Sequence, residues 1–268
     1  MTASLILVLL TDPSGAPNLL DAAAAAARAV PDPRIDALHV RLDPASTIMP
    51  SEQILTPEQG RAIEAASAAQ GTELHAAFEE WRAAGNPGNW DEVVGDPAHE
   101  MHRRGPAAAL IAMTLPAPHP PSAEQAALEA ALFGTHRPVL VVPASWQGGF
   151  GRHLVVGWRD SPATRHALTA LRPWLAAAET ITLLTVGDGP AAPPTGPLAG
   201  LPGRLTQSVL PPDAAGGDGA ALLAAAMDAG ADGLAMGAYR RGRVLEWLLG
   251  GVTEHVLHHA ALPLLLVH

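Results

Sequence analysis

The order of short apolar segments along the chain repeats once, and this repeat constrains the fold more than any other feature of the sequence. An apolar run ending in aspartate opens each half, at Leu5–Asp12 and at His153–Asp160, and an Ala- and Leu-rich stretch follows it. Three further pairs of runs follow in the same order: Ile35–Val40 and Ile181–Val186, Ala107–Met113 and Ala231–Met236, and Pro138–Val142 and Pro263–Val267. Self-similarity of this kind indicates duplicated structural units.

Each run is short and continuously apolar, as expected for a strand that is buried on both faces. The stretches between the runs have the length and composition of helices. Strands that alternate with helices are typical of a parallel sheet covered by helices on both faces. We therefore expect an α/β fold with two tandem doubly wound parallel-sheet domains, at residues 1–144 and 152–268, joined by a Gly-rich linker at 145–151.

The two predicted units differ in the middle. In the first unit, residues Pro57–Ala84 have helical spacing, and the positions expected in the core are Ile63, Leu74, Phe78 and Trp81. In the second unit, Gly187–Gly219 is rich in Pro and Gly and has almost no hydrophobic periodicity, so we expect a loop there.

Composition excludes several classes of function. The chain has 26 acidic and 16 basic residues and a net charge of −10, which disfavours binding to nucleic acid. It contains no Lys and no Cys, so a P-loop lysine, a Schiff base, a thiolate nucleophile and a disulfide are all impossible. The first apolar run, Leu5–Leu10, is too short for a signal peptide or a membrane span. We expect a cytoplasmic protein without a membrane partner.

A candidate site lies where two segments of the second unit should meet. In an open parallel sheet, ligands bind outside the carboxyl ends of the strands, at the point where strand order reverses. The end of the first strand, Val156–Ser161, and the turn after the fourth, Met236–Arg243, reach that point. Gly237 and Gly242 permit close backbone approach, and the turn also carries arginines. The last helix opens at Gly250–Thr253, and its free amides would bind an anion such as phosphate.

These segments resemble the nucleotide signature of the universal stress protein family, in its tandem two-domain form. The signature is a glycine, two residues, a second glycine, nine residues, and a third glycine followed by Ser or Thr. Gly237 and Gly250 fall on the first and third glycines, and Gly250–Val267 looks like the closing helix and strand of the family. The resemblance spans both halves and is stronger in residues 152–268.

The resemblance implies a non-catalytic stress-response binding or regulatory protein that binds ATP or a related nucleotide in the C-terminal unit. Mg²⁺ is expected only together with ATP. The residues that would bind the nucleotide are Gly237, Arg240, Arg241, Gly242, Gly250, Gly251, Thr253 and Asp160.

The sequence also departs from the signature. Arg240 stands at the second glycine, Gly251 replaces the hydroxyl residue, and Arg159 occupies the acidic position at the end of the first strand. Nucleotide binding and a decayed site therefore both stay open. In the first unit, the corresponding turn Met113–Pro121 has four prolines and no glycine, so no phosphate cradle is expected there.

Two other functions remain alternatives. One is a slow ATP hydrolase in which Asp160 helps to hold Mg²⁺, and the other is an interaction module without a ligand. The histidines of the last helix, His255, His258 and His259, have a spacing that metal ligands can use, but no acidic residue accompanies them at the spacing of a zinc motif. We expect no metal site and no catalytic residue.

The closing strands, Val139–Val142 and Leu264–Val267, are apolar and need partners if they lie at sheet edges. In the family these edges pair, so a tandem chain would resemble a dimer within one polypeptide. Association into a homodimer stays open. One continuous sheet would, on this interpretation, contradict the duplication.

Overall fold

The computed structural model describes residues 3–42, 56–117, 122–159, 161–187, 196–201, 204–211, 217–238 and 251–268. The strands and helices of the first half are β1 (Ser4–Leu9), α1 (Ala16–Ala27), β2 (Pro33–Leu42), α2 (Pro57–Ala83), β3 (Asn89–Gly95), α3 (Pro97–Arg104), β4 (Leu110–Thr114), α4 (Ala123–Glu129) and β5 (Val139–Val142). Those of the second half are β6 (His153–Gly157), α5 (Pro162–Ala177), β7 (Thr180–Val186), β8 (Arg204–Leu210), α6 (Gly217–Asp228), β9 (Gly233–Gly237), α7 (Gly251–His259) and β10 (Leu264–Val267). Short helical turns add Gly105–Ala107, Ala130–Gly134 and Gly196–Leu198.

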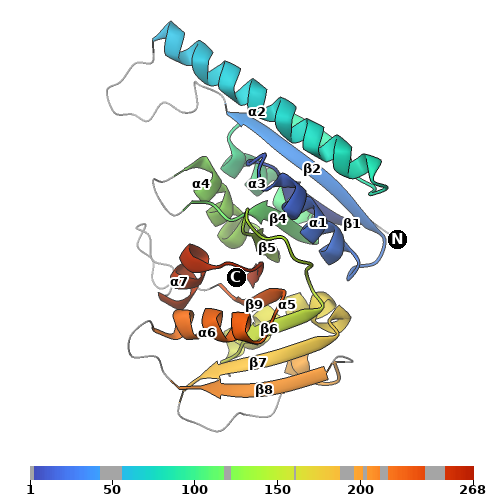
Figure 1. The fold of residues 1–268 in the computed structure, drawn as a ribbon, viewed down its shortest axis with the longest axis vertical. Coiled ribbons are helices and arrows are strands. Elements are labelled where there is room, and N and C mark those ends of the chain that lie inside the picture. Colours follow the sequence, from blue (N-terminus) through green and yellow to red (C-terminus); the bar gives the residue numbers. More distant parts are fainter. Residues whose placement is uncertain are drawn as a thin grey trace.

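The strands form one ten-stranded sheet in the order β3-β2-β1-β4-β5-β10-β9-β6-β7-β8. Every neighbouring pair is parallel except β5 and β10, which are antiparallel. Figure 1 shows the first half, blue to green, on one side of this junction and the second half, yellow to red, on the other. The predicted α/β fold with parallel strands and flanking helices is confirmed.

Continuity of the sheet does not contradict a duplication, so the criterion that we set from the sequence was wrong. The strand order is 3-2-1-4-5 in the first half, and the second half reads as the same order reversed across the β5–β10 junction. At this junction Leu140 faces Leu265, and both side chains are fully buried. The sheet is continuous because the closing strands of the two halves pair with each other.

Helices cover both faces of the sheet, because successive side chains of each strand point to opposite faces. In β1, Ile6 and Val8 belong to a buried cluster that includes residues of α1, α2 and α5, whereas Leu7 and Leu9 belong to a second cluster that includes residues of α3, α4, α6 and α7. The buried Trp174 of α5 donates its indole N–H to the carbonyl of Ala26 at 3.0 Å, which links the two halves on the first face. None of the described helices is long and apolar enough to cross a membrane.

The outer strands are the elements that the sequence pattern missed. We expected a loop over Gly187–Gly219, and this is wrong at β8, which pairs with β7 in parallel. β8 reads RLTQSVL, and most of its residues are exposed or half-buried because it lies at the edge of the sheet. β3, at the opposite edge, has a similar exposure pattern. An edge strand needs no continuous apolar run, so its sequence resembles that of a loop.

Helix α2 is confirmed over the predicted segment. Thr56 caps it, and the Thr56 and Gln59 side chains accept hydrogen bonds from each other's backbone N–H groups. Leu74, Phe78 and Trp81 are buried as expected, whereas Ile63 is only half-buried. The reason is visible in Figure 1, where the start of α2 extends past the end of β2.

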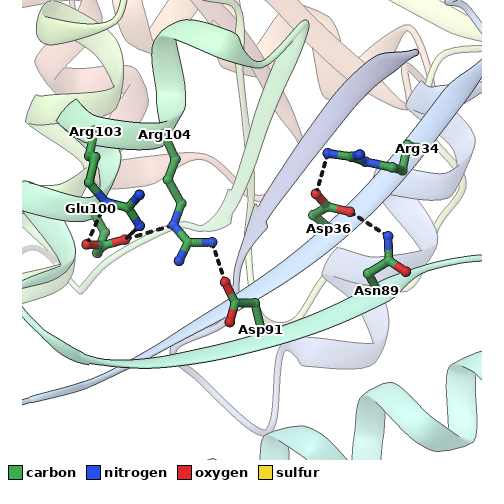
Figure 2. A network of polar contacts seen from close by, with 7 residues as sticks. All are labelled: Arg34, Asp36, Asn89, Asp91, Glu100, Arg103 and Arg104. Carbon is green, nitrogen blue, oxygen red and sulfur yellow. Dashed lines mark hydrogen bonds and ion pairs between the residues drawn. The ribbon is translucent and has the colours of Figure 1, made fainter. Parts of the chain in front are cut away.

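A polar network holds the outer part of the first half together (Figure 2). Glu100 of α3 accepts hydrogen bonds from Arg103 and Arg104, and Arg104 also contacts Asp91 of β3. The hydrogen bond from Arg103 is the main reason why the pKa of the Glu100 carboxyl lies below its ordinary value, and burial opposes this effect. A second group in Figure 2 ties β2 to β3 and consists of Arg34, Asp36 and Asn89.

Candidate functional site

A cavity of about 680 Å³ lies at the carboxyl ends of β6, β7 and β9 in the second half. Its volume is in the range of small-molecule sites, which is about 300–1,000 Å³. β6 lies between β7 and β9 in the sheet. The chain passes from β6 to β7 and β8 on one side and then returns to the other side of β6 as β9. This is the reversal of strand order at which open α/β sheets bind ligands. The cavity is therefore where the sequence predicted a site.

Three helices begin at the cavity. Ser161 precedes the first residue of α5, and Gly217 and Gly251 are the first residues of α6 and α7; all three residues line the cavity. The first turn of a helix has backbone N–H groups without intrahelical partners and carries a partial positive charge. Three such ends around one cavity favour a negatively charged ligand.

The approach of α6 to α7 depends on Gly219. A Cβ atom at this residue would lie 2.9 Å from the Cβ of His255 and 3.1 Å from the carbonyl oxygen of Val252. A larger residue would push the two helix starts apart. Gly219 therefore fixes the geometry of the cavity without contributing a polar side chain of its own.

Donor groups predominate among the polar side chains that line the cavity. Hydroxyl groups come from Ser161, Thr164, Thr185 and Thr253, and the indole of Trp158 adds an N–H. Thr164 and Thr253 are buried, and Ser161 accepts a hydrogen bond from the backbone N–H of Thr164 at 3.1 Å as the cap of α5. A ligand that is rich in acceptor atoms would match these groups.

The charged groups at the cavity are Arg159 and Asp218. They lie 3.7 Å apart, with side chains 73% and 36% exposed, so water screens their attraction. His255 also lines the cavity, and burial, with smaller contributions from the charges of His259 and His258, lowers the pKa of its imidazole. His255 is therefore uncharged at neutral pH, and Arg159 is the cation of the described lining.

Three of the predicted nucleotide residues line the cavity. Gly237 ends β9, Gly251 begins α7, and Thr253 is buried in the first turn of α7. The other predicted residues lie outside the described part of the chain, namely Asp160, Arg240, Arg241, Gly242 and Gly250.

Sequence reasoning missed several residues of the cavity. The predicted site included the segment Val156–Ser161 but gave no binding role to Trp158 or Ser161; Ser161 caps α5, and both residues line the cavity. Gly217–Gly219 was placed in a predicted loop. The sequence feature that could have identified this segment is a pair of glycines flanking an aspartate, just before a run of helix-forming residues.

The histidines of α7 interact with each other. The rings of His255 and His259 stack with centroids 4.2 Å apart, and Nδ1 of His259 lies 2.9 Å from the carbonyl oxygen of His255. Within the described ranges, no three His, Cys, Asp or Glu side chains come together as metal ligands would.

In the first half, the corresponding groups bind one another. Asp12, just after β1, accepts hydrogen bonds from the backbone and side chain of Ser14. Gln70 of α2 donates to the carbonyl of Thr11 at 2.7 Å. Ser122 and Gln125 form reciprocal side-chain caps at the start of α4. The predicted absence of a phosphate cradle concerned Met113–Pro121, of which residues 118–121 are outside the described part.

The C-terminal region matches a known sequence family. Residues 213–268, which include α6, β9, α7 and β10, match the model of the Universal stress protein family. No curated protein is similar enough in sequence to count as a match.

Solved structures resemble the whole chain. A universal stress protein from Archaeoglobus fulgidus superposes with a TM-score of 0.64 at 16% sequence identity, over 100% of this chain and 99% of the other. A protein of unknown function from Pseudomonas aeruginosa gives a TM-score of 0.57 at 13% identity, over 99% and 92%. At these identities the likeness establishes the fold, and it covers both halves.

Proposed function

We propose that this chain, which carries a universal stress protein domain in its C-terminal region, is a non-catalytic stress-response protein that binds ATP or a related nucleotide in its second half. The observation that supports this proposal is the meeting of three helix N-termini at one cavity lined by donor groups. Phosphate groups supply both the negative charge and the acceptor atoms that such a lining requires.

The lining also suggests an orientation for the nucleotide. Gly237, Gly251 and Thr253 belong to β9 and α7, on one side of β6, and would contact the phosphates. Leu184 and Val186 belong to β7, on the other side of β6, and would contact the base. In this proposal, Arg240 and Arg241 make the phosphate contacts that a glycine-rich turn makes through its backbone.

The proposal assigns no chemical step to the chain. His255 is uncharged at neutral pH, and the carboxylate of the described lining, Asp218, lies 3.7 Å from Arg159 in an exposed pair. Mg²⁺ would bind together with the nucleotide, and water and phosphate oxygens would supply most of its ligands. The hydrolase alternative needs Asp160 to hold that ion.

Titration calorimetry with ATP tests the proposal. We expect about one ATP per chain, and Thr253→Val should weaken binding about five- to tenfold, because a buried hydroxyl donor is lost while the volume is kept. Thr114→Val is the matched control: Thr114 is also a buried threonine, but it lies at the end of β4 in the first half. A wild-type protein that does not bind ATP at millimolar concentration would overturn the proposal.

A phosphate-release assay separates the proposal from the hydrolase alternative. We expect no release of phosphate above the rate without protein. Turnover by the wild type that Asp160→Ala abolishes would show that the chain is an enzyme.

Localisation and partners complete the proposal. We place the protein in the cytoplasm, with a nucleotide as its partner and without nucleic acid or membrane contacts. The β5–β10 pairing supports an arrangement like a dimer within one chain. Light scattering after gel filtration tests whether two chains associate further.

A further inference from the structure

Trp158 has an indole N–H without a hydrogen-bond partner among the described residues. The side chain follows the last residue of β6 and is 5% exposed, and its Nε1 atom is buried. Trp158 also lines the cavity. Buried donors in folded proteins are almost always paired, so an unpaired donor at a cavity calls for an explanation.

Two other tryptophans pair the same group. Trp174 is equally buried and donates to the carbonyl of Ala26, and Trp146 donates to the carbonyl of Gly149 at 3.1 Å. Trp81 also lacks an acceptor, but it belongs to an aromatic cluster with Phe78 and is not part of the cavity lining. Trp158 therefore differs in having an unpaired donor in a side chain that lines the cavity.

The position of Trp158 indicates which part of a ligand it would meet. Its backbone N–H donates to the carbonyl of Leu184 at 2.8 Å, which holds it against the end of β7. The cavity wall there includes Leu184 and Val186 of β7, whereas Gly217 and Gly251, which also line the cavity, are the first residues of α6 and α7. Anionic groups gain most at the helix starts, so the neutral part of the ligand is left for the apolar wall beside Trp158.

We propose that Trp158 donates a hydrogen bond to a ring nitrogen or carbonyl of the ligand's base and thereby selects a nucleotide over a bare polyphosphate. This inference rests on the proposed function, because it names a specificity determinant of the same cavity. The pairing satisfies the donor only in the complex. The free protein bears the cost of an unpaired N–H, and the complex does not.

The variant Trp158→Phe tests the inference, because phenylalanine keeps a flat aromatic ring and removes the donor. Binding of ATP and of tripolyphosphate, which has phosphates but no base, is measured by calorimetry for each protein. We expect Trp158→Phe to weaken ATP binding about three- to tenfold and to leave tripolyphosphate binding within twofold. Both affinities are measured on the same variant. A general loss of stability would weaken the binding of both ligands and leave the ratio of their affinities unchanged.

Trp174→Phe is the matched control. It removes an indole N–H of equal burial that is already paired with a carbonyl outside the cavity. It should lower the melting temperature and leave the affinity ratio unchanged. In the wild type, the Trp158 indole proton resonance, assigned by its absence in Trp158→Phe, should shift with ATP and stay in place with tripolyphosphate.

The outcomes are distinguishable. A wild type that binds ATP, with an unchanged ratio in Trp158→Phe, overturns this inference and leaves the proposed function intact. Equal weakening of ATP and tripolyphosphate also overturns it, because the donor would then serve the phosphates. A wild type that binds neither compound overturns the proposed function and this inference together.

Discussion

The carboxyl ends of the strands differ between the two halves, although both halves have the same strand order. In the second half, β6, β7 and β9 end at a cavity with three helix starts and a buried unpaired donor. In the first half, Gln70 binds the carbonyl of Thr11, and Ser122 and Gln125 cap α4. The same layered unit can therefore have a cavity at its strand ends or have side chains of its own chain bound there.

Helix α2 contributes most to this difference. It brings Gln70 to the end of β1 and places Leu74, Phe78 and Trp81 in the core of the first half. At the equivalent point of the second half, the described chain has the short turn Gly196–Leu198, of which Leu198 is buried. The first half thus has a long packed helix between β2 and β3, whereas the described residues between β7 and β8 form a short helical turn.

The largest effect is expected at the junction that the halves share. Leu140→Ala and Leu265→Ala remove fully buried side chains that face each other across β5 and β10, and each should cost about 2–5 kcal/mol. Both variants should unfold in a single transition in urea, followed by circular dichroism. Separate transitions for the two halves would show that the junction does not couple them.

Gly219→Val tests whether the geometry of the cavity depends on the contact of α6 with α7. Overpacking against His255 and Val252 should cost about 1–3 kcal/mol and should also weaken ATP binding. Gly60→Ala in α2 is the control, since a Cβ at Gly60 meets no atom within 4 Å and Gly60 lies in the first half, away from the cavity. Equal stability of Gly219→Val and the wild type in thermal melts would contradict this role of Gly219.

Glu100→Gln tests the network of the first half. The Glu100 side chain is 12% exposed, and the variant should lose about 1–3 kcal/mol because two arginines lose a charged acceptor. The pKa of Glu100 is lowered in the folded state, so its contribution is complete above about pH 4.3, the ordinary value, and is lost as the pH falls through the folded-state pKa. Denaturant titrations between pH 7 and pH 3 should show a smaller acid loss in the variant than in the wild type.

The smallest effect is expected when one helix-capping serine is removed from each half. Ser122→Ala in α4 and Ser161→Ala in α5 should each cost about 1 kcal/mol. Only Ser161→Ala should weaken ATP binding, because Ser161 lines the cavity. Thermal melts and calorimetry on both variants check this pair, and an altered ATP affinity in Ser122→Ala would show that the first half contributes to binding.

The sequence predicted the inner part of the fold better than its margins. The runs at β1, β4 and β5 and their counterparts in the second half are mostly apolar because both faces of these strands are buried. β3 and β8 lie at the edges, where exposure removes that pattern.

The sequence indicated the position of the cavity, but not most of the contacts around it. Gly237 was predicted from a motif whose spacing is local, and Gly251 and Thr253 from the predicted start of the last helix, and all three line the cavity. The bond between Gln70 and Thr11 joins residues 59 positions apart, and no local pattern indicates it. The unpaired N–H of Trp158 depends on the absence of an acceptor among its neighbours in space, which only coordinates reveal.

The antiparallel pairing of β5 with β10 has a consequence for how the molecule responds to dilution. Two separate subunits would part at low concentration, and both would need the same sequence at every position. Here the two halves are covalently connected, so their contact is intramolecular and independent of protein concentration. Each half was therefore free to diverge, and every molecule contains, in a fixed ratio, one half with a cavity at its strand ends and one half in which Gln70 binds at the end of the first strand.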